Sequence, residues 1–366
     1  MKAEWIPATL VVLAAAAATS QAGALYTAVE LDAPAYGWAL NSVGEVAGHR
    51  GNDAAVWSGG AATYLGTLGG PQSVAWDIND AGLAVGESLT IGDEYDTWHA
   101  FSWQHGVMTD LGTLGGGVSR AFAVNDLGHI VGEAETESGA MHAFLWEEGT
   151  MTDLGTLAGD YSSAWDINSH GQVVGLSTGQ NGRLRAFLWA DAQFSDLGTL
   201  GGGWSAAEGI NDAGQIVGVS EVADGVVHAF LWEDGVMRDI HGLAAEESWA
   251  KAINISGAVV GYWKNPGLNG GGFVYDTQAG MRDLALYLPP DLNWSGGSGR
   301  DINDAGQIAG CTVVVEGGHG TNTAFLLTPI PEPASLALLG LGACAVLARA
   351  FVVDTHRGRV NSHIGF

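Results

Sequence analysis

Short apolar runs of four to seven residues alternate with turn residues along most of the chain. Four kinds of run recur in order, as in SAWDIN, GQVVG, HAFLW and MTDLG. The first two are joined by Asn-x-x-Gly, a favourable tight-turn sequence because Asn and Gly tolerate positive φ, and the last two by Trp-x-x-Gly. This pattern predicts a four-stranded antiparallel meander.

The meander is repeated along the chain. The spacing Asn, two residues, Gly, three residues, Gly occurs seven times, with steps of 38 to 49 residues between the asparagines. A period in the low forties is typical of propeller blades and of helical repeats. The glycines argue against helices, because each would destabilise a helix interior by about 1 kcal/mol. The asparagines are Asn41, Asn79, Asn125, Asn168, Asn211, Asn254 and Asn303.

The two ends of the repeat region complement each other. The third run also occurs seven times, from residues 54–57 to residues 324–327, and no fourth run follows the last copy. Residues 24–31 form a strand-like run that is not preceded by the first three strands of a copy. We therefore predict an all-β fold, a seven-bladed β-propeller of four-stranded antiparallel blades whose ring is closed by the N-terminal strand completing the last blade. Such closure removes an exposed sheet edge, whereas an open solenoid gives no reason for complementary ends.

Composition and charge narrow the class of protein. The 57 glycines and 14 tryptophans among 366 residues suit many short strands and tight turns. A net charge of -27 argues against nucleic-acid binding, which needs clustered Lys and Arg, and is compatible with a solvated exported surface or with cations. Only Cys311 and Cys344 occur, so no internal disulfide and no cysteine-based metal site is expected, and Cys311 is interpreted as a packed residue.

Residues 1–24 have the pattern of a secretory signal peptide. Lys2 is followed by an apolar stretch from Thr9 to Ala18 and by small residues that allow cleavage after Ala22 or Ala24. The apolar stretch is too short to span a bilayer comfortably. We exclude this segment from the fold and assign residues 25–329 to the propeller.

Residues 330–366 form a second targeting segment. Pro331, Glu332 and Pro333 precede an apolar run from Leu336 to Leu347 and then Arg349. This arrangement resembles the PEP-CTERM sorting signal of Gram-negative bacteria, which implies transient anchoring by a transmembrane segment, cleavage near Pro-Glu-Pro by an exosortase, and passage through the secretion machinery. The family usually ends in a tight arginine cluster, whereas here Arg349, Arg357 and Arg359 are scattered before Phe366. An ordinary C-terminal membrane anchor is the alternative.

The repeat itself also resembles a named family. Its unit combines H-A-F-L-W, G-x-M-x-D-L-G-T-L-G-G and S-x-A-x-x-I-N-x-x-G-Q-V-V-G, and the match extends over most of the stretch from Tyr36 to Leu327. These residues are similar to the HAF repeat of extracellular bacterial proteins. The resemblance implies an exported repeat protein, found outside the cell or at its surface, and supplies no reaction.

Several repeated residues are possible metal ligands. His99, His142 and His228 open the third strand, but Arg185 and Gly271 replace them elsewhere, which favours packing over metal binding. Residues 77–82 and 301–306, both Asp-Ile-Asn-Asp-Ala-Gly, resemble the start of a calcium loop. Both place alanine at the fifth ligand position and lack the glutamate at position twelve, so hairpin turns are favoured. We predict no metal site and no cofactor, with adventitious Ca²⁺ binding left open.

The aromatic residues divide into regular and irregular sets. The regular set ends the third strand and is expected to pack between blades: Trp57, Trp103, Trp146, Trp189 and Trp232. The irregular set lies in or beside connecting loops: Tyr95, Trp98, Trp204, Trp249, Trp263 and Trp294. A platform for sugars would use the irregular set, although core packing is the commoner role for each member.

The connections that differ between copies are the expected place for binding. The loops between the second and third strands open on the same face as the crossings between blades, and variable loops on a rigid scaffold commonly bind ligands. We predict a ligand contact at Asp93, Glu94, Tyr95 and Asp96, with Trp98 beside them. The variable loops span residues 87–98, 133–141, 177–184, 220–227, 262–271 and 312–322.

No motif selects a catalytic residue. A nucleophile elbow, a phosphate loop and a paired-histidine helix are all absent from the sequence, and nothing picks out two carboxylates as a glycosidase pair. The expected function is that of an exported, non-catalytic propeller that binds an extracellular matrix or exopolysaccharide component. The exopolysaccharide is implied by the resemblance to PEP-CTERM proteins. The alternatives are a propeller hydrolase or lyase with an acid pair near the central opening, and a structural matrix filler.

Overall fold

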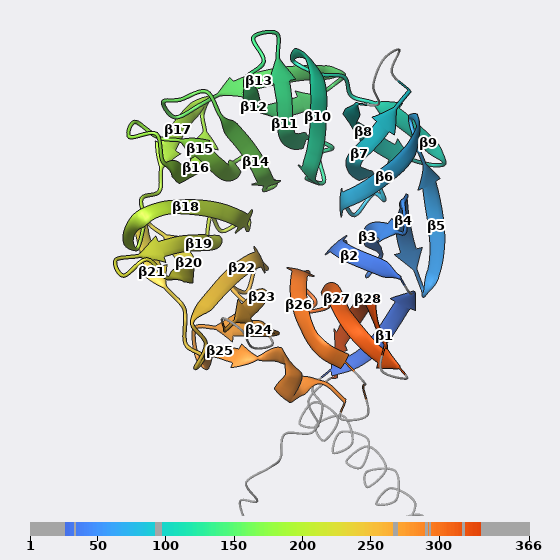
Figure 1. Cartoon of the computed structure of the whole chain (residues 1–366), viewed down its shortest axis with the longest axis vertical. Helices are drawn as coiled ribbons and strands as arrows, with labels where there is room; N and C mark the ends of the chain where they lie inside the picture. Colours follow the sequence, from blue (N-terminus) through green and yellow to red (C-terminus); the bar gives the residue numbers. More distant parts are fainter. Residues whose placement is uncertain are drawn as a thin grey trace, which may run out of the picture.

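The computed structural model describes residues 26–32, 34–91, 97–265, 270–289, 292, 294–316 and 319–330. Its strands form seven four-stranded antiparallel sheets arranged as blades around a central axis (Figure 1). In six blades the four strands follow one another in sequence from the axis to the rim. The predicted seven-bladed propeller is confirmed.

The first three blades contain strands β2 to β13. Blade 1 is β2 (Ala35–Leu40), β3 (Val46–Arg50), β4 (Asp53–Ser58) and β5 (Ala61–Gly66). Blade 2 is β6 (Gly69–Ile78), β7 (Ala84–Thr90), β8 (Trp98–Gln104) and β9 (Val107–Asp110). Blade 3 is β10 (Gly115–Val124), β11 (Ile130–Thr136), β12 (Met141–Glu147) and β13 (Thr150–Gly155).

The next three blades contain strands β14 to β25. Blade 4 is β14 (Ser162–Ile167), β15 (Val173–Thr178), β16 (Leu184–Ala190) and β17 (Gln193–Asp196). Blade 5 is β18 (Gly201–Ile210), β19 (Ile216–Val222), β20 (Val227–Glu233) and β21 (Val236–Asp239). Blade 6 is β22 (Glu247–Ile253), β23 (Val259–Lys264), β24 (Gly271–Asp276) and β25 (Gly280–Asp283), and the 3-10 helix η1 (Leu284–Tyr287) follows it.

Blade 7 joins the two ends of the propeller. It contains β26 (Trp294–Ile302), β27 (Ile308–Glu316) and β28 (His319–Pro329), and its outer strand is β1 (Tyr26–Asp32). Strands β1 and β28 are antiparallel, with Tyr26 opposite Pro329 and Val29 opposite Leu326 (Figure 1). The N-terminal strand therefore closes the ring as predicted and covers an edge that would otherwise be open to another chain.

The hydrophobic core lies between the blades. One cluster joins Val56 and Leu65 of blade 1 to Ala75 and Phe101 of blade 2, and similar clusters join the later blades. The regular tryptophans pack at the edges of these clusters, where all but Trp57 stay partly exposed. A ring of fully buried phenylalanines two residues earlier fills the centres: Phe101, Phe144, Phe187, Phe230, Phe273 and Phe325. The phenylalanines, more than the predicted tryptophans, fill the wedges.

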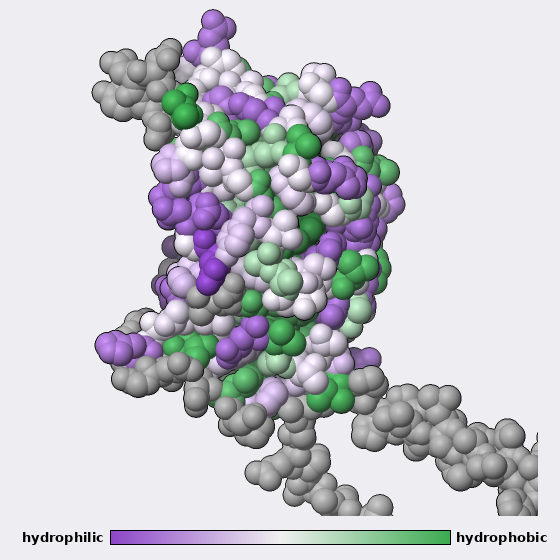
Figure 2. All heavy atoms as spheres, turned by 90° about the vertical axis from the view of Figure 1, so that its right-hand side faces the viewer, coloured by the Kyte–Doolittle hydropathy of each residue, from purple (hydrophilic) through white to green (hydrophobic). Residues whose placement is uncertain are grey.

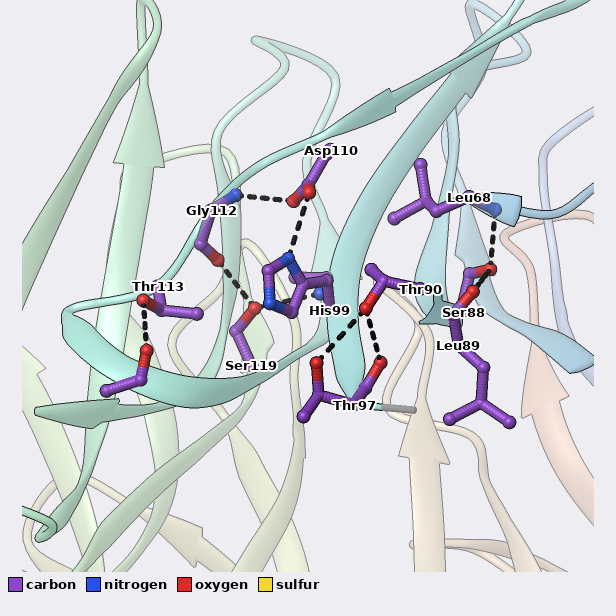
Figure 3. Close-up of polar contacts among 12 residues, drawn as sticks. Leu68, Ser88, Leu89, Thr90, Thr97, His99, Asp110, Gly112, Thr113 and Ser119 are labelled. Carbon is purple, nitrogen blue, oxygen red and sulfur yellow. Dashed lines mark hydrogen bonds and ion pairs between the residues drawn. The ribbon is translucent and has the colours of Figure 1, made fainter. Parts of the chain in front are cut away.

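Buried serines link consecutive blades. Ser119 of β10 donates from Oγ to the carbonyl of Gly112 at 2.6 Å and accepts the N–H of Ala100 at 2.8 Å (Figure 3). Beside it, Nδ1 of His99 lies 2.9 Å from the carboxylate of Asp110 (Figure 3). The same pairing recurs at 2.9 Å between His142 and Asp153. These histidines thus join the third and fourth strands of a blade.

The rim of the ring mixes polar and apolar side chains. In the side view of Figure 2, hydrophilic and hydrophobic residues are interspersed across the visible face. Within the part of the chain that the structure describes, no helix is long and apolar enough to cross a membrane. The predicted apolar segment from Leu336 to Leu347, the sorting residues Pro331, Glu332, Pro333 and Arg349, and residues 1–24 lie outside the described residues.

Candidate functional site

The loop cluster predicted from sequence is only partly described. Asp93, Glu94, Tyr95 and Asp96 lie outside the described residues. Trp98 begins β8, pairs with Leu89 of β7 and is partly buried. Trp98 therefore lies at the start of the third strand of blade 2, on the loop face.

A different set of residues gathers at the axis. In every blade the innermost strand has a β-bulge three residues before the turn asparagine. A bulge leaves one residue unpaired and redirects its side chain. The bulged side chains are partly exposed: Trp38, Trp76, Phe122, Trp165, Glu208, Lys251 and Arg300.

The second glycine of each repeat permits this bulge. A Cβ added to Gly86 would lie 1.9 Å from the carbonyl oxygen of Val74, and one added to Gly175 would lie 2.0 Å from that of Ser163. In all seven blades, the corresponding distance from the added Cβ to a carbonyl oxygen of the innermost strand is 1.8 to 2.1 Å. No larger residue fits so close to backbone, so the Gly-x-x-x-Gly spacing serves the bulge as well as the turn.

The bulged aromatics of neighbouring blades touch one another. The ring centroids of Trp38 and Trp76 are 5.0 Å apart, and those of Trp76 and Phe122 are 6.2 Å apart. Tyr36 stacks on Trp38 at 5.7 Å. Trp165 packs against the apolar cluster of blades 4 and 5, where Trp204 and Trp249 also lie. We call Tyr36, Trp38, Trp76, Phe122 and Trp165 the aromatic belt.

Charged bulge residues complete the ring. Lys251 Nζ lies 2.7 Å from Glu208 Oε1, an ion pair between blades 5 and 6. The guanidinium carbon of Arg300 in blade 7 lies 4.8 Å from the ring centroid of Trp38 in blade 1. The bulged residues therefore form the aromatic belt in blades 1 to 4 and are charged in blades 5 to 7.

An acid pair lies beside the belt. Arg120 bridges Glu87 at 2.8 Å and Glu133 at 2.7 Å, and Nε1 of Trp76 donates to Glu87 at 3.3 Å. Burial raises the pKa of Glu87, while the charge of Arg120 opposes this shift. Burial and the neighbouring Glu133 raise the pKa of Tyr161, which donates to Glu133, to about 12. Because Arg120 holds both carboxylates, they join blades 2 and 3 and fix the position of Trp76.

Three further carboxyls lie on the innermost strands one residue after the bulge. Asp77 accepts the N–H of Val124 in the next blade at 2.7 Å, Asp166 that of Ile210, and Asp301 that of Leu40. Burial, together with the charge of Asp301, raises the pKa of Asp77 to about 8. Burial raises the pKa of Asp166 to about 7 and that of Asp301 to about 6, against the hydrogen bonds from backbone N–H groups.

These carboxyls make stability depend on pH. They keep protons in the folded protein at pH values where the unfolded chain has released them. Their stabilising contribution is therefore full near pH 4 and is lost as the pH rises to about 8, by up to about 1.4 kcal/mol per pH unit for each protonated carboxyl. We expect the melting temperature to fall by several degrees between pH 5 and pH 8.

The control is Asp77→Ala, because Ala39, Ala123 and Ala252 occupy this position in other blades. Thermal melts monitored by circular dichroism should show a flatter pH profile for this variant between about pH 4 and pH 8. An unchanged slope would contradict the assignment of the pH dependence to Asp77.

The turn asparagines surround the axis at the end of the innermost strands, three residues beyond the bulge. Each donates from Nδ2 to the backbone carbonyl of the asparagine in the next blade, at 2.9 to 3.3 Å, and Asn303 donates to Asn41, so the ring of bonds is closed. Asp80 and Asp126 accept N–H groups from the preceding blade around the same opening. This cavity, of about 270 Å³, is lined by all seven asparagines.

The segments that resembled calcium loops form these turns. The N–H of Leu83 donates to Asn79 Oδ1 at 2.9 Å, and that of Gln307 donates to Asn303 Oδ1 at 3.0 Å. The prediction of hairpin turns is confirmed. Among the described residues, no three or more His, Cys, Asp or Glu side chains are grouped so as to hold a metal ion.

Sequence reasoning missed the aromatic belt. Trp38, Trp76, Phe122 and Trp165 share one place in the repeat, three residues before the turn asparagine, so the signal was present. These four residues lie on predicted strands, whereas the predicted sugar platform was limited to aromatic residues in or beside loops. Only the tertiary structure shows that Trp38, Trp76 and Phe122 meet around the axis.

Comparison with known proteins finds only distantly similar solved structures. No family model and no curated protein matches the chain. TolB from Acinetobacter baumannii is 12% identical, with a TM-score of 0.43 over 69% of this chain and 65% of that chain. The structure of YCF48 bound to D1 peptide is 12% identical, with a TM-score of 0.44 over 84% and 97%. A Mycobacterium tuberculosis puromycin-hydrolyzing peptidase is 12% identical, with a TM-score of 0.44 over 74% of this chain and only 47% of its own.

Proposed function

We propose that the protein is an exported, non-catalytic propeller that binds an extracellular polysaccharide at the aromatic belt. The observation that carries the proposal is the contact of partly exposed rings from successive blades around the axis, with Trp38 against Trp76 and Trp76 against Phe122. A sugar ring presents a C–H face to an aromatic ring and hydroxyls to polar groups. The belt offers large apolar faces beside Glu208, Lys251 and Arg300.

The rigidity of the belt supports a binding role. Trp76 is held by its hydrogen bond to Glu87, which Arg120 fixes in turn. Rings held in place before binding lose little conformational entropy when a ligand arrives. The belt is therefore suited to bind sugars without rearrangement of the scaffold.

The export part of the proposal rests on the two ends of the chain. The signal-peptide pattern of residues 1–24 and the resemblance of residues 330–366 to a PEP-CTERM signal point to secretion, transient anchoring in the inner membrane and an exosortase as partner. The resemblance to HAF repeats agrees with an extracellular or cell-surface protein. A host that lacks exosortase should retain the full-length chain at the membrane.

The alternative is a hydrolase or lyase that cleaves such a polymer. The acid pair bridged by Arg120 beside the belt is Glu87 and Glu133, and burial raises the pKa of Glu87 as a general acid requires. Arg120 binds both carboxylates, however, which favours their structural role. Incubating the protein with the polysaccharide of its host separates the possibilities. Binding without chain shortening supports the proposal, and chain shortening would establish the enzyme. The absence of both binding and shortening would favour a structural filler.

Replacing Trp76 with alanine should weaken polysaccharide binding by about 10- to 100-fold, because a ring of this size commonly contributes about 1–3 kcal/mol to recognition. Isothermal titration calorimetry with oligosaccharides of the host polymer measures the loss. Trp76→Phe should retain most of the affinity.

The matched control is Tyr64→Ala, which removes an exposed aromatic ring from β5 at the rim of the propeller. It should bind as the wild type does. Equal affinities for Trp76→Ala and the wild type, with both folded, would exclude the belt as the binding site.

A further inference from the structure

A pocket of about 250 Å³ lies between blades 6 and 7. Its walls come from β23, β24, β26, β27 and β28, which are neighbours in Figure 1. They include parts of the variable loops 262–271 and 312–322, on the predicted binding face. Pockets for drug-sized ligands measure about 300–1,000 Å³, so this one suits a single sugar unit. Its lining includes Tyr262, Trp263, Lys264, Arg300, Cys311 and Asn322.

Arg300 lies between the belt and this pocket. Its guanidinium carbon is 4.8 Å from the ring centroid of Trp38 and 5.6 Å from that of Tyr262. Ring contacts of this kind use the charge of the guanidinium, whereas its N–H donors lie in its own plane. The contacts hold Arg300 in place without satisfying its donors.

Arg300 also lacks an anionic partner among the described residues. The Lys and Arg side chains of the adjacent blade 6 are paired: Lys251 with Glu208, Lys264 with Glu247 and Arg282 with Asp276. Asp301 follows Arg300 in the chain, but its carboxylate accepts the N–H groups of Leu40 and Ile302. An unpaired arginine beside a pocket is unusual in a protein of net charge -27.

The buried donors around the pocket are also incompletely satisfied. Nε of Arg300 and Nε1 of Trp263 are both buried without a hydrogen-bond partner in the described structure. Buried polar groups are nearly always paired, so two such donors at one pocket need an explanation. Both are donors that no acceptor of the described structure satisfies, so this part of the pocket suits a ligand that carries acceptors. A carboxylate meets this condition and pairs with guanidinium through two parallel hydrogen bonds.

We propose that this pocket binds the carboxylate of a uronic acid unit in the polysaccharide held by the aromatic belt. The proposal rests on the proposed function and names its substrate class as an acidic polysaccharide. Arg300 stacks on Trp38 of the belt and lines the pocket, so one polymer chain contacts both. The net charge of the protein repels acidic polymers at long range, but at about 0.15 M salt that repulsion is screened beyond about 8 Å. Selectivity therefore arises in the pocket.

The experiment measures binding of galacturonate oligomers and of their carboxyl-reduced, neutral counterparts of equal length to the intact protein at about 0.15 M salt. The wild type should bind the acidic oligomer at least about 10-fold more tightly. Arg300→Ala should lose about 10- to 100-fold for the acidic oligomer and change little for the neutral one. Arg300→Lys should be intermediate, because an ammonium group keeps the charge but lacks the planar fork.

The matched control is Arg238→Ala, which removes an equal charge from a side chain that is 60% exposed and paired with Glu233. It should keep the acidic preference. The proposal is overturned if folded Arg300→Ala keeps that preference, if the wild type does not distinguish the two oligomers, or if polyglutamate of equal charge binds as tightly. Loss of binding to both oligomers in Trp76→Ala, with the acidic preference intact in Arg300→Ala, would uphold the belt and reject the pocket. If the wild type bound neither oligomer but bound the polysaccharide of its host, the pocket would be rejected and the belt would stand, whereas no binding of any of these polymers would reject both.

Discussion

Replacing Gly175 with alanine is expected to lower the free energy of unfolding by more than about 3 kcal/mol, a cost at the upper end for one added methyl group. A Cβ at this position would lie 2.0 Å from the carbonyl oxygen of Ser163 and 3.0 Å from Cα of Ala164. Both are backbone atoms of the neighbouring strand, so no side chain can turn aside. The strands would have to separate at the bulge that places Trp165 at the axis.

Substitutions at two other glycines separate the effect of the close backbone contact from the effects of strand propensity and backbone strain. Gly117→Ala should be nearly neutral, because Glu135 Oε2, at 3.5 Å, is the nearest atom to the added Cβ. Gly149→Ala meets nothing within 4 Å but has φ of +84°, so it measures backbone strain alone, about 1 kcal/mol. Urea denaturation gives the free energies of all three. If Gly175→Ala unfolded at the same urea concentration as Gly117→Ala, the close approach would not be the reason for this glycine.

Replacing Asn211 with aspartate is expected to cost about 3 kcal/mol at pH 7. Asn211 is 6% exposed, and its Nδ2 donates to the carbonyl of Asn254 in the next blade at 2.9 Å. Its Oδ1 accepts the N–H of Gln215 at 3.0 Å. Aspartate has the same shape but places an oxygen against the carbonyl of Asn254, which breaks the ring of seven bonds at one point.

The control is Asn181→Asp, the same chemical change in an exposed turn, where Oδ1 accepts the N–H of Arg183. This variant should melt within about 1 °C of the wild type, since such a surface substitution changes stability by less than about 0.5 kcal/mol. Asn211→Asp should melt at least about 6 °C lower. Similar melting temperatures for the two variants would show that the inter-blade ring contributes little to stability.

The order and number of strands could be predicted from the sequence because they depend on local chemistry. Asn-x-x-Gly specifies a tight turn because the Asn side chain accepts a backbone N–H, as Asn79 does from Leu83, and because Gly adopts positive φ, as Gly82 does at 72°. Closure by residues 24–31 followed from the missing fourth strand of the last copy, since an unpaired strand edge must be covered.

The candidate sites could not be predicted in the same way, because they depend on contacts between blades. Trp38, Trp76 and Arg300 are 38 and 224 residues apart along the chain, and only ring closure brings blade 7 against blade 1. The direction of their side chains is set by a bulge, which the second glycine allows but which no pattern of apolar residues indicates. The sequence determined the blades, their number and their closure, whereas the tertiary structure decided which side chains meet at the axis.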